Sequence, residues 1–254
     1  MRYGFDEIFK RFKRAVTTYS MLSDEMAVMV GLSGGKDSLT LLYALKQYQR
    51  ISKYKYALAA GHVSLGFAGD DLSRMKNYCK ELEIPFFCQQ TEIGPVIFEY
   101  RQETNPCALC AKMRRGAFNT LAKEQGFSKV ALAHHQDDVV ETLLLNLFFE
   151  SRVGSFNPVT YLDRMDITVI RPLIYVPEAQ ISYFSRKTPL PVTASNCPQN
   201  CLGKRQEIKA LLKSLEELAP SGKDRAVGAL ERLYGVKWDG IKPIGDEQRT
   251  IEHT

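Results

Sequence analysis

Six consecutive residues have the composition of a phosphate-binding loop. They stand between an apolar run and a helical pattern, and they are Ser33, Gly34, Gly35, Lys36, Asp37 and Ser38. Glycine lets the backbone adopt positive φ and approach a ligand closely, and the first free amides of the following helix point at an anion. The lysine adds positive charge, and the serine hydroxyls add hydrogen-bond donors. We therefore predict that these six residues bind the phosphates of a nucleotide.

The loop differs from the common P-loop. That pattern requires a glycine where this chain has Val30, and a serine or threonine where it has Asp37. A Gly-Gly turn followed by serine is also an ordinary connection between a strand and a helix. The strand, the glycine pair, the lysine and the serine together favour phosphate binding. We expect Lys36 to neutralise phosphate charge and Asp37 to help hold magnesium, so both are candidate catalytic residues.

A second polar group follows the predicted strand 129–134. It contains two imidazoles and two carboxylates, which are His134, His135, Asp137 and Asp138. Ligands of a doubly wound sheet bind beyond the carboxyl ends of its strands, so this group and the loop are expected to face one crevice. A structural helix start, with acids favouring the dipole, is the alternative. We predict a catalytic role for Asp137 and nucleotide contacts for His134 and for His62, which ends another strand.

The six cysteines fall into two groups. No signal sequence is recognisable, so a reducing compartment is expected, where metal binding is more typical than disulfides. Cys79 and Cys88 lie in helical and strand-like segments and are expected to be buried. The others form two close pairs, which are Cys107 with Cys110 and Cys197 with Cys201. Such pairs hold zinc, an iron–sulfur cluster or a redox disulfide, and spacing alone does not decide between the two metals. The redox pair is disfavoured because no strand precedes Cys107.

The charge pattern favours a nucleic-acid partner. The formal net charge is +5, and the basic residues gather in the first stretch of the chain and directly after each cysteine pair. The two later clusters are Lys112, Arg114 and Arg115, and Lys204 and Arg205. A solvated helix face is the alternative, but the coincidence with the cysteines favours RNA. No apolar run approaches the length of a membrane span, so we expect no membrane partner and a cytoplasmic protein.

Short apolar runs alternate with longer helical patterns. This predicts an α/β fold with a doubly wound parallel sheet and helices on both faces. The predicted strands are residues 26–32, 56–65, 84–89, 129–134 and 167–170. The predicted helices are residues 39–49, 70–82, 111–125, 139–149, 204–218 and 223–234. We divide the chain into a basic N-terminal helix (1–25), a main domain (26–200) and a helical C-terminal extension and tail (201–254).

Five motifs, in order, resemble the tRNA 2-thiocytidine synthetases of the TtcA type, which are PP-loop ATPases. They are the loop at 33–38, the first cysteine pair with residues 114–116, the polar group with residues 141–142, and residues 146–149 and 170–175. The resemblance covers most of residues 26–210. It implies the PP-loop fold, with a loop that holds pyrophosphate while a substrate oxygen attacks the α-phosphate of ATP.

The resemblance also implies cofactors, partners and roles. The cofactors are ATP, magnesium and a [4Fe–4S] cluster bound by three cysteines. The partners are tRNA, whose pyrimidine C2 oxygen is adenylated and replaced by sulfur, and a sulfur donor such as sulfide or a persulfide carrier. A homodimer is also implied. By position, Cys107 and Cys110 match the family's first cysteine pair. Arg114 and Arg115 match its basic residues near nucleotide and RNA, so Arg114 is a further candidate catalytic residue.

The second cysteine pair departs from the family pattern, because it is one residue wider than the family's CxxC. A related variant has a single cysteine followed by proline, as in Cys197-Pro198. We therefore predict Cys197 as the third cluster ligand, with Cys201 as the alternative.

Three other functions remain open from the sequence. One is a zinc-stapled PP-loop ligase without sulfur transfer. Another is a cluster protein that removes sulfur from thiolated bases or thiopyrimidines. The third is a nucleotide-sensing or tRNA-binding module without turnover, which the presence of Lys36, Asp37 and the paired acids disfavours.

Overall fold

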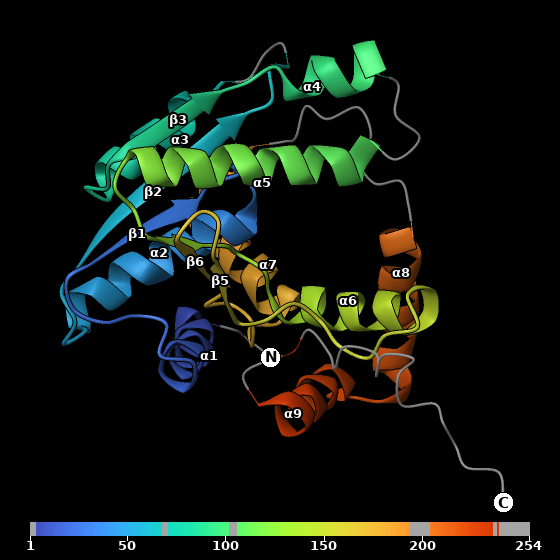
Figure 1. Ribbon diagram of the computed structural model, residues 1–254. Helices are drawn as coiled ribbons and strands as arrows, with labels where there is room; N and C mark the ends of the chain where they lie inside the picture. Colours follow the sequence, from blue (N-terminus) through green and yellow to red (C-terminus); the bar gives the residue numbers. More distant parts are fainter. Residues whose placement is uncertain (1–3, 68–70, 102–105, 194–203, 236–237, 239–254) are drawn as a thin grey trace, which may run out of the picture.

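A single six-stranded sheet organises the chain (Figure 1). The computed structural model describes residues 4–67, 71–101, 106–193, 204–235 and 238. The strands are β1 (Met26–Gly31), β2 (Tyr56–Ser64), β3 (Phe86–Gln90), β4 (Lys129–Ala131), β5 (Val159–Leu162) and β6 (Ile167–Ile170). They lie in the order β3-β2-β1-β4-β6-β5, and every neighbouring pair is parallel except β5 with β6. The predicted doubly wound parallel sheet is confirmed, with an antiparallel edge strand that was not predicted.

The helices follow the predicted pattern, apart from three that were not predicted and one that begins early. They are α1 (Phe5–Thr18), α2 (Lys36–Ile51), α3 (Ser73–Glu81), α4 (Ile93–Pro95), the π-helix η1 (Val96–Arg101), α5 (Pro106–Glu124), α6 (Gln136–Phe149), α7 (Glu178–Lys187), α8 (Lys204–Leu218) and α9 (Gly222–Tyr234). Helices α4 and α7 and the π-helix η1 were not predicted. Helix α5 begins five residues before the predicted start at residue 111, because Pro106 suits the first position of a helix. The first cysteine pair therefore lies inside α5.

Helices cover both faces of the sheet, as predicted (Figure 1). Strand side chains alternate between the faces. On β1, Val28 and Val30 belong to the core that includes α1, α2 and α7, whereas Met29 belongs to the core under α5. Cys79 is buried as predicted. Cys88 is only half buried, because it lies on the edge strand β3.

The winding reverses at the centre of the sheet. The chain starts at β1, moves outward through β2 and β3, and then returns to β4 on the other side of β1. The loops that follow β1 and β4 leave the same edge of the sheet, one on each side of this switch point. Crevices of this kind are where doubly wound sheets bind ligands. Both predicted polar motifs begin in these two loops and continue into the first turn of the helix that follows, α2 or α6.

The terminal helices pack against the sheet domain. Ile8 and Phe12 of α1 are fully buried in the same core as α2. Helices α8 and α9 contact α6 and each other, and bury Ile208 and Leu230 in that core. Within the described residues, no helix combines the length and the apolar character needed to cross a membrane.

Candidate active site

The phosphate loop requires glycine at its first turn. Gly34 has φ of +80°, a conformation that L-residues rarely adopt. A Cβ at this position would lie 2.1 Å from Oγ1 of Thr193, whose amide donates to the carbonyl oxygen of Gly34 at 3.0 Å. The segment before residue 194 therefore packs directly on the loop and fixes its path.

The loop presents donors where helix α2 begins. Gly35 precedes the helix in an extended conformation and has no side chain to cap the first amides. The Oγ atoms of Ser33 and Ser38 lie 3.2 Å apart, and Oγ of Ser38 donates to the carbonyl oxygen of Gly35 at 2.9 Å. The two hydroxyls and the positive end of the helix dipole thus meet at one point, which is suited to an anion.

Lys36 is held by two carboxylates. Its Nζ lies 3.0 Å from Oδ1 of Asp37 and 2.9 Å from Oε1 of Glu178, the first residue of α7. Oε2 of Glu178 accepts from Nζ of Lys209 on α8 at 2.7 Å. Burial opposes the charge of Lys36, but Asp37 and Glu178 outweigh it and raise the pKa of the amine. The lysine that was predicted to meet phosphate is therefore fully protonated beside the loop.

Two residues of the second motif cap helix α6. His135 precedes the helix, and its Nδ1 accepts from the amide of Asp138 at 3.4 Å. Oδ2 of Asp138 accepts from the amide of His135 at 3.0 Å. This reciprocal arrangement is a capping box, so these two side chains have a structural role. The other two members of the motif, His134 and Asp137, face elsewhere.

Asp137 joins α6 to α7 and α9. Its Oδ2 accepts from the backbone amide of Glu178 at 2.7 Å, and its Oδ1 lies 2.5 Å from Nζ of Lys223. The side chain of Asp137 is only 9% exposed. Since Glu178 also binds Lys36, the two predicted motifs are connected through one residue that the sequence did not indicate.

His134 is held as a neutral imidazole. Its Nδ1 accepts from Nε of Arg171 at 3.2 Å, which places the proton of the neutral ring on Nε2. Burial and the positive charge of Arg171 lower the pKa of His134 to about 4. Arg171 is fixed in turn by the carbonyl oxygen of Asn157 at 2.6 Å and by Oγ1 of Thr160 at 3.1 Å. The unpredicted strand β5 thus supports this histidine.

A cavity of about 800 Å³ opens between the loop and helix α5. Among its lining residues are Ser33, Asp37, Ser38, His62, His134, Arg114, Arg115 and Arg171. His62 also donates from Nδ1 to the carbonyl oxygen of Leu32 at 2.7 Å, which fixes its ring at the wall. The volume is in the range of nucleotide and cofactor sites. The cavity therefore brings together most of the residues predicted to bind nucleotide.

The first cysteine pair lies one helical turn before the part of α5 that lines this cavity, and neither cysteine is among the lining residues. Ala111 and Arg114 line the cavity, and each follows one of the cysteines by four residues, Cys107 and Cys110 respectively. Residues four apart lie on the same side of a helix. Cys107 is exposed and Cys110 is partly exposed. Cys197 and Cys201 lie outside the described residues, so the predicted third ligand has no position here.

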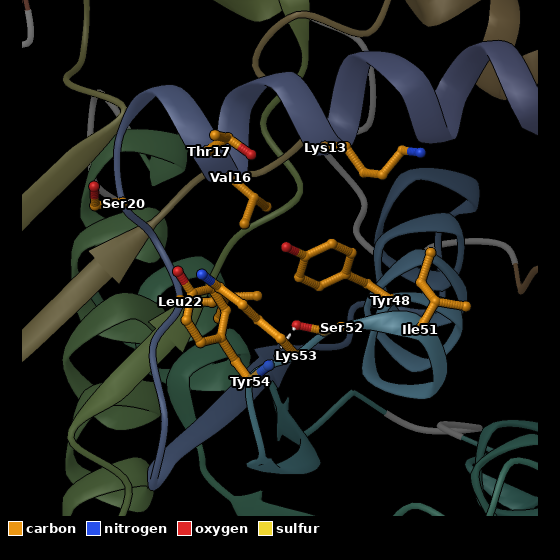
Figure 2. A pocket seen from close by; sticks show the side chains of 10 residues that line it. All are labelled: Lys13, Val16, Thr17, Ser20, Leu22, Tyr48, Ile51, Ser52, Lys53 and Tyr54. Carbon is orange, nitrogen blue, oxygen red and sulfur yellow. Dashed lines mark hydrogen bonds between the residues drawn. The ribbon is translucent and has the colours of Figure 1, made fainter.

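A second cavity of about 400 Å³ lies at the opposite edge of the sheet (Figure 2). It is bounded by α1, by the C-terminal end of α2 and by the loops that precede β1 and β2. Its cations lie on aromatic rings, with Nζ of Lys13 5.1 Å from the ring centre of Phe9 and Nζ of Lys53 5.1 Å from that of Tyr54. No predicted site residue lines this cavity.

Several charged residues around the site were missed from the sequence. They are Glu178, Lys209, Lys223 and Arg171. Glu178 and the two lysines come from elements far along the chain, and their local sequences have no distinguishing pattern. Arg171 lies within a motif shared with the resembling family, but the sequence did not indicate its role.

Comparison with known proteins identifies the family. A family model described as a PP-loop domain matches residues 6–201. The chain is similar to the tRNA-cytidine(32) 2-sulfurtransferase of Citrifermentans bemidjiense, with 35% identity over 234 residues, covering 91% of this chain and 92% of the relative. It is similar to the protein of the same name from Geobacter sulfurreducens, with 37% identity over 227 residues, covering 87% and 88%.

A solved structure agrees. The U34-tRNA thiolase NcsA from Methanococcus maripaludis, determined with its [4Fe–4S] cluster, matches with a TM-score of 0.73 and 26% identity, over 89% of this chain and 78% of that one. The family that the motifs indicated is thereby confirmed. The chain belongs to the PP-loop family and, within it, to the tRNA-cytidine 2-sulfurtransferases.

Proposed function

We propose that this protein uses ATP to activate the C2 oxygen of a cytidine in tRNA and replaces that oxygen with sulfur. One observation carries the proposal: the cavity that the phosphate loop lines extends along α5 to Ala111 and Arg114, one helical turn beyond Cys107 and Cys110. Nucleotide activation and sulfur delivery must meet at one base, so their residues must lie close together. The relatives named as tRNA 2-sulfurtransferases support the substrate.

The first step is adenylation. The C2 oxygen attacks the α-phosphorus, the bond between the α- and β-phosphates breaks, and pyrophosphate leaves. The hydroxyls of Ser33 and Ser38 and the first amides of α2 hold the departing phosphates, and Lys36 neutralises their charge. Asp37 lies at the loop and lines the cavity, where it is placed to hold magnesium. Asp137 keeps α7 beside the loop through the amide of Glu178.

The cysteines fit an iron–sulfur cluster. Cys107 and Cys110 open helix α5, where the helix dipole favours the negative charge of thiolates, and both are accessible. With Cys197 they would hold a [4Fe–4S] cluster, which supplies one iron that is not bound by protein and can carry sulfur. In the second step sulfide bonds to C2, and AMP leaves with the original oxygen. If a persulfide carrier is the donor, a second thiol forms a disulfide with the carrier's sulfur and supplies the two electrons that bring the delivered sulfur to the sulfide level.

The arginines of the cavity suit the RNA. Arg114 and Arg115 enter from α5 and Arg171 from the end of β6, so three guanidinium groups line the cavity. Guanidinium groups bind phosphates and the α-phosphate of an adenylated base through paired hydrogen bonds. His134 is neutral with its proton on Nε2, so it can donate a hydrogen bond to the substrate. The positive charge that binds anions comes from the arginines.

Two alternative enzymes differ in testable ways. A cluster protein that removes sulfur needs no adenylation, so its turnover would not depend on ATP. A zinc-stapled ligase would be colourless and would contain no sulfide. The names of the relatives and of the similar structure favour sulfur addition over both.

The test combines metal analysis with activity. Protein purified without oxygen should be brown, with iron and acid-labile sulfide near four per chain, the number in the cluster itself. Exchange to serine at Cys107, Cys110 or Cys197 should bleach it, whereas Cys201→Ser, the matched control, should not. The wild type should form 2-thiocytidine in tRNA only with ATP and magnesium. A colourless zinc protein, or sulfur removal without ATP, would overturn the proposal.

A further inference from the structure

The phosphate-loop lysine shares its carboxylate with a lysine from the C-terminal helices. Oε1 of Glu178 binds Nζ of Lys36 at 2.9 Å, and Oε2 binds Nζ of Lys209 at 2.7 Å. Lys209 lies on α8, which begins at residue 204, far along the chain from the phosphate-loop lysine, and reaches the loop through this contact. Two ammonium groups on one carboxylate are close enough to be bridged by one pyrophosphate, which presents more anionic oxygens than a carboxylate.

The side chain of Glu178 can leave without disturbing its backbone. Its amide is held by Oδ2 of Asp137 at 2.7 Å and begins helix α7, so the main chain is fixed. The side chain of Glu178 is 21% exposed, and that of Lys209 is 48% exposed. Rotation about the side-chain bonds of Glu178 is therefore enough to release both lysines to another anion.

Glu178 is ionised, as an ion pair with the two lysines requires. Burial alone would raise the pKa of Glu178, but its hydrogen bonds to Lys209 and Lys36 prevail and lower it to about 2. The carboxylate is therefore ionised at neutral pH and competes directly with phosphate for the two lysines. A competing carboxylate next to a phosphate loop lowers the affinity of the loop for nucleotide.

We propose that Lys209 is a second phosphate-binding lysine of this site, and that Glu178 holds Lys36 and Lys209 beside the loop until the triphosphate displaces it. The inference rests on the proposed function, because it requires that the loop binds ATP. Helix α8 thereby becomes part of the active site, and nucleotide binding is linked to the docking of α8 on α6, which brings Lys209 to Glu178.

Opposite changes in affinity test the proposal. Binding of a non-hydrolysable ATP analogue with magnesium is measured by calorimetry on the full chain. Glu178→Gln should tighten binding about threefold to tenfold, because it removes the competing charge. Lys209→Met should weaken binding by about the same factor, and Lys209→Arg should restore most of it. Lys213→Met, which removes an exposed charge from the same helix, is the matched control and should change the affinity less than about twofold.

The outcomes separate this inference from the proposed function. Weaker binding by Glu178→Gln, as expected if Glu178 were a magnesium ligand or only a structural residue, would overturn the inference. Unchanged binding by Lys209→Met would do the same. If the wild type failed to bind the analogue at all, the proposed function would fall together with the inference. Melting temperatures of each variant report whether a change in affinity comes from loss of folded protein.

Discussion

The two cavities lie at opposite ends of helix α2, and a lysine stands near each end of that helix. The N-terminus of α2 faces the 800 Å³ cavity, and its C-terminus faces the 400 Å³ cavity. At the first end Lys36 binds two carboxylates, and at the second end Lys53 lies over the ring of Tyr54. The helix dipole favours anions at its start and cations at its end. At the second cavity, Lys53 therefore interacts favourably with the negative end of α2. Lys36 lies at the positive end, where the helix dipole favours an anion rather than a cation.

The backbone differs as well. The loop at the start of α2 contains Gly34 with positive φ and presents uncapped amides. The turn at the end of α2 is closed locally, since Oγ of Ser52 accepts from the amide of Tyr54 at 3.0 Å. A lysine beside a cavity thus does not identify a phosphate site. The first cavity is distinguished by converging amides and by a glycine with positive φ at a place where a Cβ would clash with Thr193.

The largest expected effect is at Lys36. Lys36→Met should lower ATP–pyrophosphate exchange about a hundredfold to a thousandfold, as does loss of one donor to a developing anion. The two carboxylates that lose Lys36 are not left buried without a partner, because Asp37 is partly exposed to solvent and Glu178 keeps its ion pair with Lys209. The melting temperature should therefore change little. The exchange rate and the melting temperature are measured on the same preparation. If Lys36→Met kept the wild-type rate of ATP–pyrophosphate exchange, then Lys36 would not bind the phosphates, and the lysines at the two ends of α2 would not differ in function.

His134 lines the first cavity and has no counterpart among the residues that line the second, so it gives the first cavity a pH dependence that can be measured. Burial lowers its pKa to about 4 from 6.5, so the unfolded chain binds a proton that the folded chain does not. Stability should therefore fall as the pH drops from about 6.5 to 4, by up to about 3 kcal/mol. Urea unfolding at several pH values should show this loss in the wild type and a flatter profile for His134→Gln. Identical profiles would show that the ring is not held neutral.

Gly34→Ala tests the turn that distinguishes the first cavity. Positive φ costs an alanine about 1–2 kcal/mol, and its Cβ would meet Oγ1 of Thr193. Both the free energy of unfolding and the affinity for ATP should fall. Adding Thr193→Ala should recover the part due to the contact but not the part due to φ. Full recovery would mean that the backbone conformation itself carries no cost.

Much of the fold was predictable because its signals are local. Buried parallel strands are apolar runs, and β1, β2 and β4 are found where such runs occur. Strand β5 was missed because it is a four-residue edge strand that mixes polar and apolar residues and pairs only on one side. Helix α7 was missed because it follows Pro177 without a side-chain cap, so its start has no sequence signature.

The site was predictable only where its residues are neighbours in sequence. The phosphate loop and the polar group after β4 are contiguous, and their spacing indicates chemistry. The sequence analysis selected Asp137 and His134 from this group. It did not show that His135 and Asp138 form a capping box, because that depends on where each side chain points. Glu178 lies 142 residues from Lys36, and no local pattern relates them. Such contacts exist only after the sheet has formed and α7 has docked.

The smallest expected effect is at Lys53, at the other end of α2. Lys53→Met removes an exposed cation from the ring of Tyr54 and from the negative end of the helix. Each contribution is at most about 1 kcal/mol, so the free energy of unfolding should fall by about that amount or less. Affinity for ATP should not change, because the charge lies at the opposite edge of the sheet from the phosphate loop. Lys53→Arg keeps the cation and should match the wild type in both measurements. If Lys53→Met weakened nucleotide binding as much as Lys36→Met does, then general positive charge, rather than the polarity of α2, would determine where the anion binds.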